Sequence, residues 1–248
     1  IAGATSLPEL LAAINSIAQG VPNLAAGSMF GSSMFNMFVL AILDLLLQKA
    51  RILRKVAMNH ALAASLANVM TGLAVFFILA NLDLKIGWVG IDSLLIMAVY
   101  IGGVRILQGN GPPPAPEAID DAKVPSLRRA GIGFALATLV LVGATPYLVS
   151  SANAIAEQTG ISAGFIGATL LAATTSLPEL VTTIAAARIG AYDLAVGNLF
   201  GSNIFNMFAL GLTDFFFTEG RFLSAIDPAF ALVGLLGLLL TGMGQIGN

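Results

Sequence analysis

Cysteine is absent from the 248-residue chain, and histidine occurs once, as His60. Disulfide bonds and thiolate metal sites are therefore excluded, as is a metal site built from several imidazoles. Charged residues make up only 10% of the chain, whereas an ordinary soluble domain carries about a quarter. Because 57% of the residues are hydrophobic, the composition predicts an all-α polytopic membrane protein surrounded by lipid.

The few charges do not gather into a basic patch, and the formal net charge is −2. A nucleic-acid-binding surface needs clustered Lys and Arg, so no nucleic-acid partner is expected. Nothing in the sequence indicates a cofactor or an obligate protein partner.

Two blocks of sequence occur twice. The block TSLPEL stands at residues 5–10 and again at 175–180, and the block FGSxxFNMF stands at 30–38 and again at 200–208. The copies align without a gap at a constant offset of 170 residues, and half of the positions in 5–44 are identical to their counterparts. A long internal repeat that places a glutamate inside an apolar helix predicts one binding site built from two halves.

Apolar stretches of about 20 residues are long enough to cross a bilayer as helices. The sequence predicts eight of them, at 1–18, 24–47, 56–80, 87–107, 128–150, 161–187, 194–217 and about 223–244. A polar piece near 151–159 is expected to separate the fifth from the sixth.

The repeat register divides the chain into a first repeat at 1–107, a Gly/Pro-rich cytoplasmic linker at 108–127 and a second repeat at 128–248. The helix at 128–150 has no counterpart before the first TSLPEL block, and the helix at 87–107 has none after the second repeat. The register therefore predicts one further helix at each end of the fold.

Positive charges predict the orientation. When the loops are assigned alternately to two sides, one side receives only Lys85 and Arg221. The other receives nine residues: Lys49, Arg51, Arg54, Lys55, Arg105, Lys123, Arg128, Arg129 and Arg188. We expect this second side to be cytoplasmic. The two TSLPEL helices then run in opposite directions, so the repeats are inverted and their site should lie near the bilayer midplane.

Each TSLPEL helix combines oxygen ligands with a break. Thr5 and Ser6 lie four and three residues before Glu9, so two hydroxyls and a carboxylate share one helix face. Pro8 lacks an N–H and should kink the helix, freeing the carbonyl of Ala4. At membrane depth a free carbonyl is tolerated where it lines a cavity or binds an ion. The same pattern recurs at Thr175, Ser176, Pro178 and Glu179.

The second block adds more oxygen atoms. Ser32 and Asn36 are four residues apart, as are Ser202 and Asn206. Gly27/Gly31 and Gly197/Gly201 form small-residue stripes that predict close helix packing. Carboxylate, amide, hydroxyl and carbonyl oxygens suit hard cations such as Ca²⁺, Na⁺ or Mg²⁺. Ca²⁺ is favoured over Mg²⁺ because it accepts more oxygens in a flexible geometry.

Structural interpretations compete with this one. Proline with Ser or Thr also occurs in membrane helices as a simple kink, and Asn36 and Asn206 alone could join helices. A carboxylate within a span, however, costs roughly 2.5–3.5 kcal/mol on insertion scales, and here it occurs twice. Asp44 and Asp214 also match across the repeats. Near helix ends, they are expected to be water-exposed carboxylates, or to attract cations at the mouths of a pathway.

The paired TSLPE and GSxxFN blocks resemble the calcium/cation antiporter superfamily, in particular its prokaryotic sodium/calcium exchanger branch, over essentially the whole chain. The resemblance implies an inverted-repeat transporter fold of 5+5 helices, of which about eight are present here. It also implies a multi-pass protein of the cell membrane whose substrates are Ca²⁺ and Na⁺, and no enzymatic activity.

The resemblance further implies a set of ion ligands. These are the Ala2 carbonyl, Thr5, Ser6, Glu9, Ser32 and Asn36, with the Ala172 carbonyl, Thr175, Ser176, Glu179, Ser202 and Asn206. The implied carbonyls lie two residues earlier than those the prolines should free. At Asn206 some sodium-coupled members have Asp, so the coupling ion and the stoichiometry stay open.

Four functions were weighed against the residues. The leading hypothesis is antiport of Ca²⁺ against Na⁺ by alternating access, and a proton- or potassium-coupled antiporter is the main alternative. A channel would need a continuous pore, whereas the two carboxylates are expected at one central site. An intramembrane hydrolase would need a Ser/His pair, a metal site or paired acids, and only paired acids are present.

Overall fold

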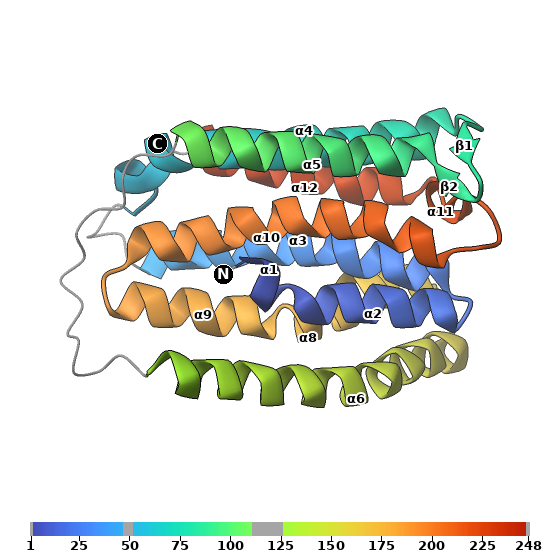
Figure 1. Ribbon diagram of the computed structural model, residues 1–248, viewed down its shortest axis with the longest axis horizontal. Helices are drawn as coiled ribbons and strands as arrows, with labels where there is room; N and C mark the ends of the chain where they lie inside the picture. The colour runs from blue at the N-terminus through green and yellow to red at the C-terminus, as the bar shows by residue number, and fades with distance from the viewer. Residues whose placement is uncertain (1, 47–51, 111–125, 247–248) are drawn as a thin grey trace.

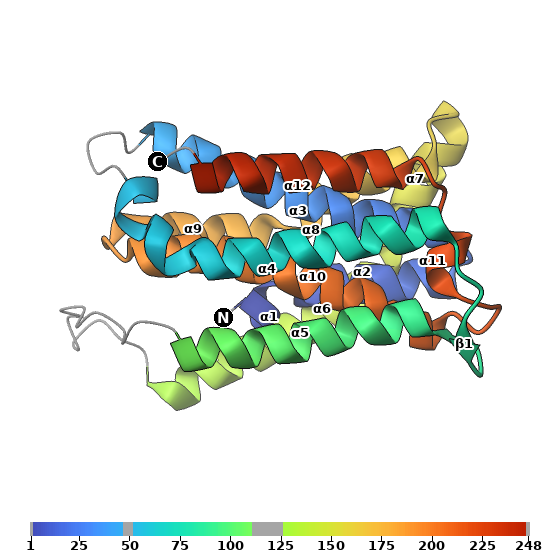
Figure 2. The same ribbon diagram turned by 90° about the horizontal axis from the view of Figure 1, so that it is seen from above.

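Long apolar helices run along a common direction and pack into one bundle (Figure 1). The computed structural model describes residues 2–46, 52–110 and 126–246. Viewed at right angles, the same helices form several layers, so that α3 and α10 lie inside the bundle (Figure 2). The buried hydrophobic core includes Met29, Phe30, Met207 and Leu210 from these two helices.

The first half begins with a broken helix and ends with a hairpin and a further helix. Its elements are α1 (Ala2–Thr5), α2 (Leu7–Ala18), α3 (Pro22–Leu46), α4 (Ile52–Ala80), β1 (Lys85–Ile86), β2 (Val89–Gly90) and α5 (Ile91–Asn110). The two short strands pair antiparallel in the connection between α4 and α5.

The second half begins with the longest helix. Its elements are α6 (Leu127–Thr159), α7 (Ala163–Ile166), the π-helix η2 (Gly167–Leu171), α8 (Ala172–Thr175), α9 (Leu177–Arg188), α10 (Tyr192–Thr213), the 3₁₀-helix η3 (Asp214–Phe216), α11 (Phe222–Ala225) and α12 (Phe230–Ile246). The expected separation near 151–159 was wrong, because α6 continues through this polar stretch and ends at a left-handed Gly160.

The eight predicted spans correspond to whole or broken helices. Among the described residues, four helices are long and apolar enough to cross a membrane, within α3, α4, α5 and α6. The pair 163–175 and 177–188, which is bent by 43°, makes a fifth candidate. The first and last spans contain shorter apolar helices, α2 and α12. The predicted kinks in the two TSLPEL helices are thus found as breaks, and five of the eight predicted spans coincide with candidate membrane spans of the described residues.

Both TSLPEL helices break at the same residue. Ser6 separates α1 from α2 with φ −87° and ψ 13°, and Ser176 separates α8 from α9 with φ −85° and ψ 8°. Pro8 and Pro178 lie in the first turn of the following helix. Backbone N–H groups in a first turn have no acceptor within the helix, so a proline there costs no helical hydrogen bond. The repeated sequence thus produces the same backbone twice.

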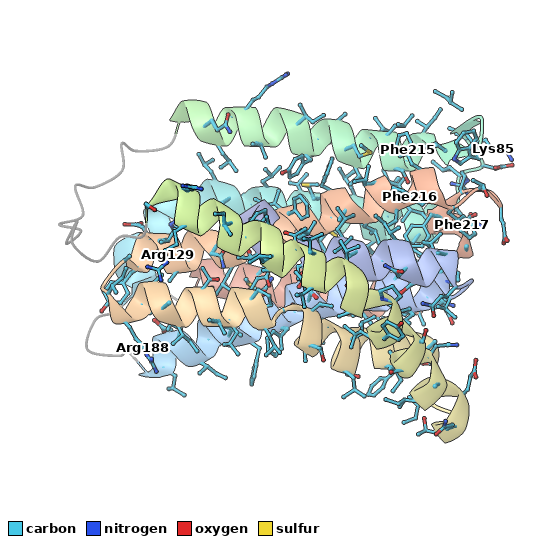
Figure 3. The ribbon with its side chains drawn as sticks, turned by 60° about the horizontal axis from the view of Figure 1, so that its bottom comes forward. Lys85, Arg129, Arg188, Phe215, Phe216 and Phe217 are labelled. Atoms are coloured by element: carbon cyan, nitrogen blue, oxygen red, sulfur yellow. The ribbon has the colours of Figure 1, made fainter. Side chains whose placement is uncertain are left out.

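The two copies point in opposite directions. From the middle of the bundle, α2 runs toward the end that carries β1 and β2, whereas α9 runs toward the end where α6 begins (Figure 1). Lys85 lies at the first end, and Arg129 and Arg188 lie at the other (Figure 3). This arrangement confirms the inverted-repeat fold. Lys49, Arg51, Lys123 and most of the predicted linker at 108–127 lie outside the described residues, as do the side chains of Arg54 and Lys55.

The glycines of α3 allow the two halves to touch through their backbones. A Cβ added at Gly31 would overlap the backbone of Ala168 in η2, and one added at Gly27 would overlap the carbonyl oxygen of Gly164 in α7. The prediction of close packing is confirmed for this stripe. On α10, Gly201 lies against Ala2 and Gly197 against the ring of His60.

The hairpin end of the bundle is held by buried polar groups. Asp214 accepts backbone N–H groups from Gly90 at 2.7 Å and Phe222 at 2.5 Å. Beside it, Arg221 pairs with Asp92 at 2.7 Å, and both of these side chains are 3% exposed. The expectation that Asp214 is water-exposed or attracts cations was wrong. Its carboxylate is fully buried and joins the hairpin to α11.

We expect Gly31→Ala to destabilise the protein by about 1–3 kcal/mol, because the new methyl group meets backbone that cannot rotate away. Gly72→Ala in α4 is the matched control, since its Cβ would make only an ordinary 3.6 Å contact with Leu238. Thermal unfolding in detergent measures both, and equal unfolding midpoints for the two variants would contradict the packing described.

The predicted sidedness is tested with single cysteines, since the chain has none of its own. In oriented vesicles, a membrane-impermeant thiol reagent should label Lys85→Cys from the outside. It should label Arg188→Cys only after the vesicles are permeabilised, because the two positions lie at opposite ends of the bundle (Figure 3). The cysteine-free parent supplies the background, and labelling of both variants from one side would refute the topology.

Candidate functional site

The two helix breaks meet at the centre of the bundle and exchange hydrogen bonds. Ser6 donates its hydroxyl to Oε1 of Glu179 at 2.7 Å, and Ser176 donates to Oε1 of Glu9 at 2.8 Å. All four side chains are at most 1% exposed. Each glutamate therefore receives a hydrogen bond from the repeat to which it does not belong.

Local helix structure places the glutamates at this centre. Because the breaks occur at Ser6 and Ser176, Glu9 and Glu179 fall in the first turns of α2 and α9. The N-terminal end of a helix carries partial positive charge and unpaired N–H groups, so it stabilises a carboxylate nearby. Since α2 and α9 run outward in opposite directions, their positive ends face each other across the site (Figure 1).

Side chains from α3 and α10 extend the network. Ser202 donates to the same Oε1 of Glu179 at 3.3 Å, and the hydroxyls of Ser32 and Thr175 are 3.5 Å apart. Thr5, at the end of α1, contacts the side-chain oxygen of Asn198 at 3.3 Å. The predicted serines and threonines of both repeats are thus brought together around the two glutamates.

The two carbonyl oxygens that the resemblance implies as ligands accept hydrogen bonds from their own chain segments. The Ala2 carbonyl accepts from the hydroxyl of Thr5 at 3.0 Å and from the N–H of Ser6 at 2.9 Å. The Ala172 carbonyl likewise accepts from Thr175 at 3.2 Å and Ser176 at 3.0 Å. Both carbonyls are therefore engaged within their own helical turn, and binding a cation would require the threonine hydroxyls to release them.

Several buried polar atoms at the site have no hydrogen-bond partner among the described residues. They are Oε2 of Glu9, Oε2 of Glu179, Oδ1 of Asn36 and both amide atoms of Asn206. A buried polar atom without a partner costs roughly 1–3 kcal/mol, and native proteins contain few of them. Their concentration on residues of the repeated blocks indicates a site for a ligand that supplies positive charge.

Two site residues were missed by the sequence-based prediction. Asn198 contacts Thr5, and Asn203 accepts a hydrogen bond from Nδ2 of Asn36 at 3.0 Å. Both are buried in α10. A signal was present: their counterparts in the first repeat are Ser28 and Ser33, so both copies carry a polar residue where an apolar helix needs none.

The available ligands are therefore carboxylate, hydroxyl and amide oxygens from four segments, two from each repeat. Oxygen ligands of this kind suit hard cations. The two carboxylates supply negative charge, and the neutral oxygens can replace part of a hydration shell. The site is suited to the binding of a cation inside the membrane.

Comparison with known proteins identifies relatives. The family model described as sodium/calcium exchanger protein matches residues 1–107 and 130–245. Inner membrane protein YrbG of Escherichia coli K12 is 28% identical over 216 residues, which cover 84% of this chain and 65% of that protein. Sodium/calcium exchanger MaX1 of Methanosarcina acetivorans is 48% identical over 79 residues, which cover 32% of this chain and 22% of that protein.

The fold is also found in a solved structure. The sodium-calcium exchanger NCX_Mj, soaked with Na⁺ and Sr²⁺, superposes with a TM-score of 0.54 at 24% sequence identity. The superposition covers 97% of this chain and 75% of that one. The chain spans 65% of the length of YrbG and a smaller share of MaX1. With the family model matching most of its residues in both repeats, this multi-pass helical membrane protein belongs to the sodium/calcium exchanger protein family.

Proposed function

We propose that the protein is a membrane antiporter that exchanges Ca²⁺ for Na⁺ by alternating access at the site between Glu9 and Glu179. The observation that carries this proposal is the reciprocal pair of hydrogen bonds from Ser6 to Glu179 and from Ser176 to Glu9. It joins two inverted repeats at a buried centre, where transporters built from such repeats bind their substrates.

The proposed ligands of the transported ions come equally from both repeats. They are the Ala2 carbonyl, Thr5, Ser6, Glu9, Ser32, Asn36, the Ala172 carbonyl, Thr175, Ser176, Glu179, Ser202 and Asn206. Ca²⁺ fits the two carboxylates best, because it tolerates many oxygen ligands in irregular geometry. Na⁺ fits the hydroxyl and amide oxygens, which carry no full charge.

We place the protein in the cell membrane, in contact with lipid, and Ca²⁺ and Na⁺ are its proposed substrates. The inverted arrangement suits alternating access because each half reaches toward an opposite end of the bundle. Since each glutamate is bonded to the other half, a movement that parts the halves breaks both bonds together.

A proton- or potassium-coupled antiporter is the second candidate, because the charge of the site is equally compatible with it. Asn36 and Asn206 are neutral, so the network contains two ionisable groups, Glu9 and Glu179. Two protons would neutralise the charge of these two carboxylates as completely as one Ca²⁺ would. Na⁺ remains our first choice because the neutral oxygens around Glu9 and Glu179 can coordinate Na⁺, whereas protonation of the two carboxylates does not require them.

Glu9→Gln and Glu179→Gln should each abolish calcium transport or reduce it by at least about tenfold, because each removes one of two charges that balance Ca²⁺ in a desolvated site. The measurement is calcium uptake into proteoliposomes that contain the protein expressed from its complete reading frame. Glu157→Gln is the matched control, since Glu157 is exposed near the end of α6. Normal uptake by either site variant would refute the assignment.

Exchange should be electroneutral or only weakly electrogenic, because one Ca²⁺ or two Na⁺ neutralise the two carboxylates. A third Na⁺ would leave the loaded site with a net charge in a medium of low dielectric constant. Uptake in proteoliposomes under a clamped membrane potential, with Na⁺, K⁺ or a proton gradient as the driving ion, measures this. Strong voltage dependence with three Na⁺ per Ca²⁺ would show that the charges of Glu9 and Glu179 do not set the stoichiometry.

A further inference from the structure

Asn203 stands beside the proposed ion ligands without being one of them. It follows Ser202 in α10, is 2% exposed, and makes two hydrogen bonds to α3. Its Nδ2 donates to the backbone carbonyl of Ser33 at 3.3 Å, and its Oδ1 accepts from Nδ2 of Asn36 at 3.0 Å. Asn203 therefore links the two helices that carry the FGSxxFNMF blocks.

These two bonds fix which way the amide of Asn36 points. An asparagine side chain has a donor end and an acceptor end, and rotation by half a turn exchanges them. The carbonyl of Ser33 can only accept, so the NH₂ group of Asn203 faces it and the oxygen of Asn203 faces Asn36. Asn36 must then turn its NH₂ group toward Asn203. Its own Oδ1 is left buried and without a hydrogen-bond partner.

We propose that Asn203 is a positioning residue, which holds the Asn36 side chain so that it offers oxygen rather than NH₂ to the transported cation. This role rests on the proposed function, because it matters only where a cation binds. The NH₂ group carries partial positive charge and would repel a cation, so an amide that is free to rotate is a poorer ligand. A ligand that is already oriented loses less freedom when the ion arrives.

Asn206, in the second repeat, has no equivalent of the hydrogen bond between Asn203 and Asn36. Ser33 occupies the position of the first repeat that matches Asn203, and its hydroxyl donates to the carbonyl of Met29 in its own helix at 3.2 Å. Asn206, the counterpart of Asn36, has no hydrogen-bond partner at either amide atom. The two halves are therefore unequal. Asn36 is held by a hydrogen bond from outside its own helix, whereas no hydrogen bond holds the amide of Asn206.

The test replaces Asn203 by the residue that the first repeat has at this position. Asn203→Ser should weaken Ca²⁺ binding roughly three- to tenfold, the value of one lost hydrogen bond, because the amide of Asn36 is released. The measurement is binding of radioactive calcium to the purified protein expressed from its complete reading frame. Ser16→Ala is the control, since Ser16 is equally buried but donates only to Ala12 in its own helix at 2.8 Å.

A second experiment, made in the Asn36→Asp variant, distinguishes a role of Asn203 in orienting Asn36 from a role in stabilising the packing of the helices. In Asn36→Asp the carboxylate offers two equivalent oxygens, so its orientation no longer matters. Adding Asn203→Ser to this variant should not weaken its Ca²⁺ affinity, because the carboxylate needs no partner to orient it and loses only an oxygen that faces it. If Asn203 only supported the packing, the second substitution would weaken binding by the same factor in both backgrounds.

The outcomes distinguish this inference from the proposed function. If the unaltered protein binds no Ca²⁺, the proposed function is wrong, and the role of Asn203 is wrong with it. If the unaltered protein binds Ca²⁺ and Asn203→Ser binds it equally well, or the loss is the same in the Asn36→Asp background, only the positioning role is overturned.

Discussion

The burial of two carboxyl groups in an apolar bundle is the constraint on which the rest of the structure depends. Glu9 and Glu179 are fully enclosed, and a carboxylate enclosed without partners is among the most unfavourable groups a protein can contain. The fold meets this constraint by breaking two helices at Ser6 and Ser176. The breaks bring each glutamate to a helix N-terminus and bring a serine of the opposite repeat within hydrogen-bond distance.

The same interaction explains why the repeats are needed as a pair. One copy alone would hold a glutamate without the crossed serine and a serine without its acceptor. Inversion brings the copies together so that each completes the other. The second carboxylate oxygen, Oε2 of each glutamate, has no partner among the described residues, and two such oxygens make the centre receptive to positive charge.

Much of the fold could be predicted from the sequence because it depends on periodic properties. Hydrophobic runs located the spans, the 170-residue offset predicted the repeats, and the positions of Lys and Arg separated the two ends of the bundle. The repeated blocks also pointed to Ser6 and Glu9, although the structure joins each of them to the opposite repeat and not to one another. These features are local, or they are repeated, and so the sequence displays them directly.

Features that depend on contacts between distant segments could not be predicted in this way. The burial of Asp214 depends in part on the N–H group of Gly90, which lies 124 residues earlier in the chain and which no local pattern around Asp214 predicts. The resemblance implied that the carbonyls of Ala2 and Ala172 are ion ligands, and in the structure these oxygens accept the hydroxyls of Thr5 and Thr175, three residues further along. Asn203 was missed because comparison of the two copies favours identical residues, whereas its importance lies in differing from Ser33.

The contact between α3 and η2 has a mechanical consequence. At Gly31 the backbone of one repeat lies directly against the backbone at Ala168 of the other, with no side chain between them. Contact this close leaves no space for even one methyl group, so the two backbones are packed as tightly as a protein interior allows. A side chain larger than hydrogen at position 31 would therefore push the two repeats apart at this point, and the separation of α3 from η2 is set by the absence of a side chain rather than by its shape.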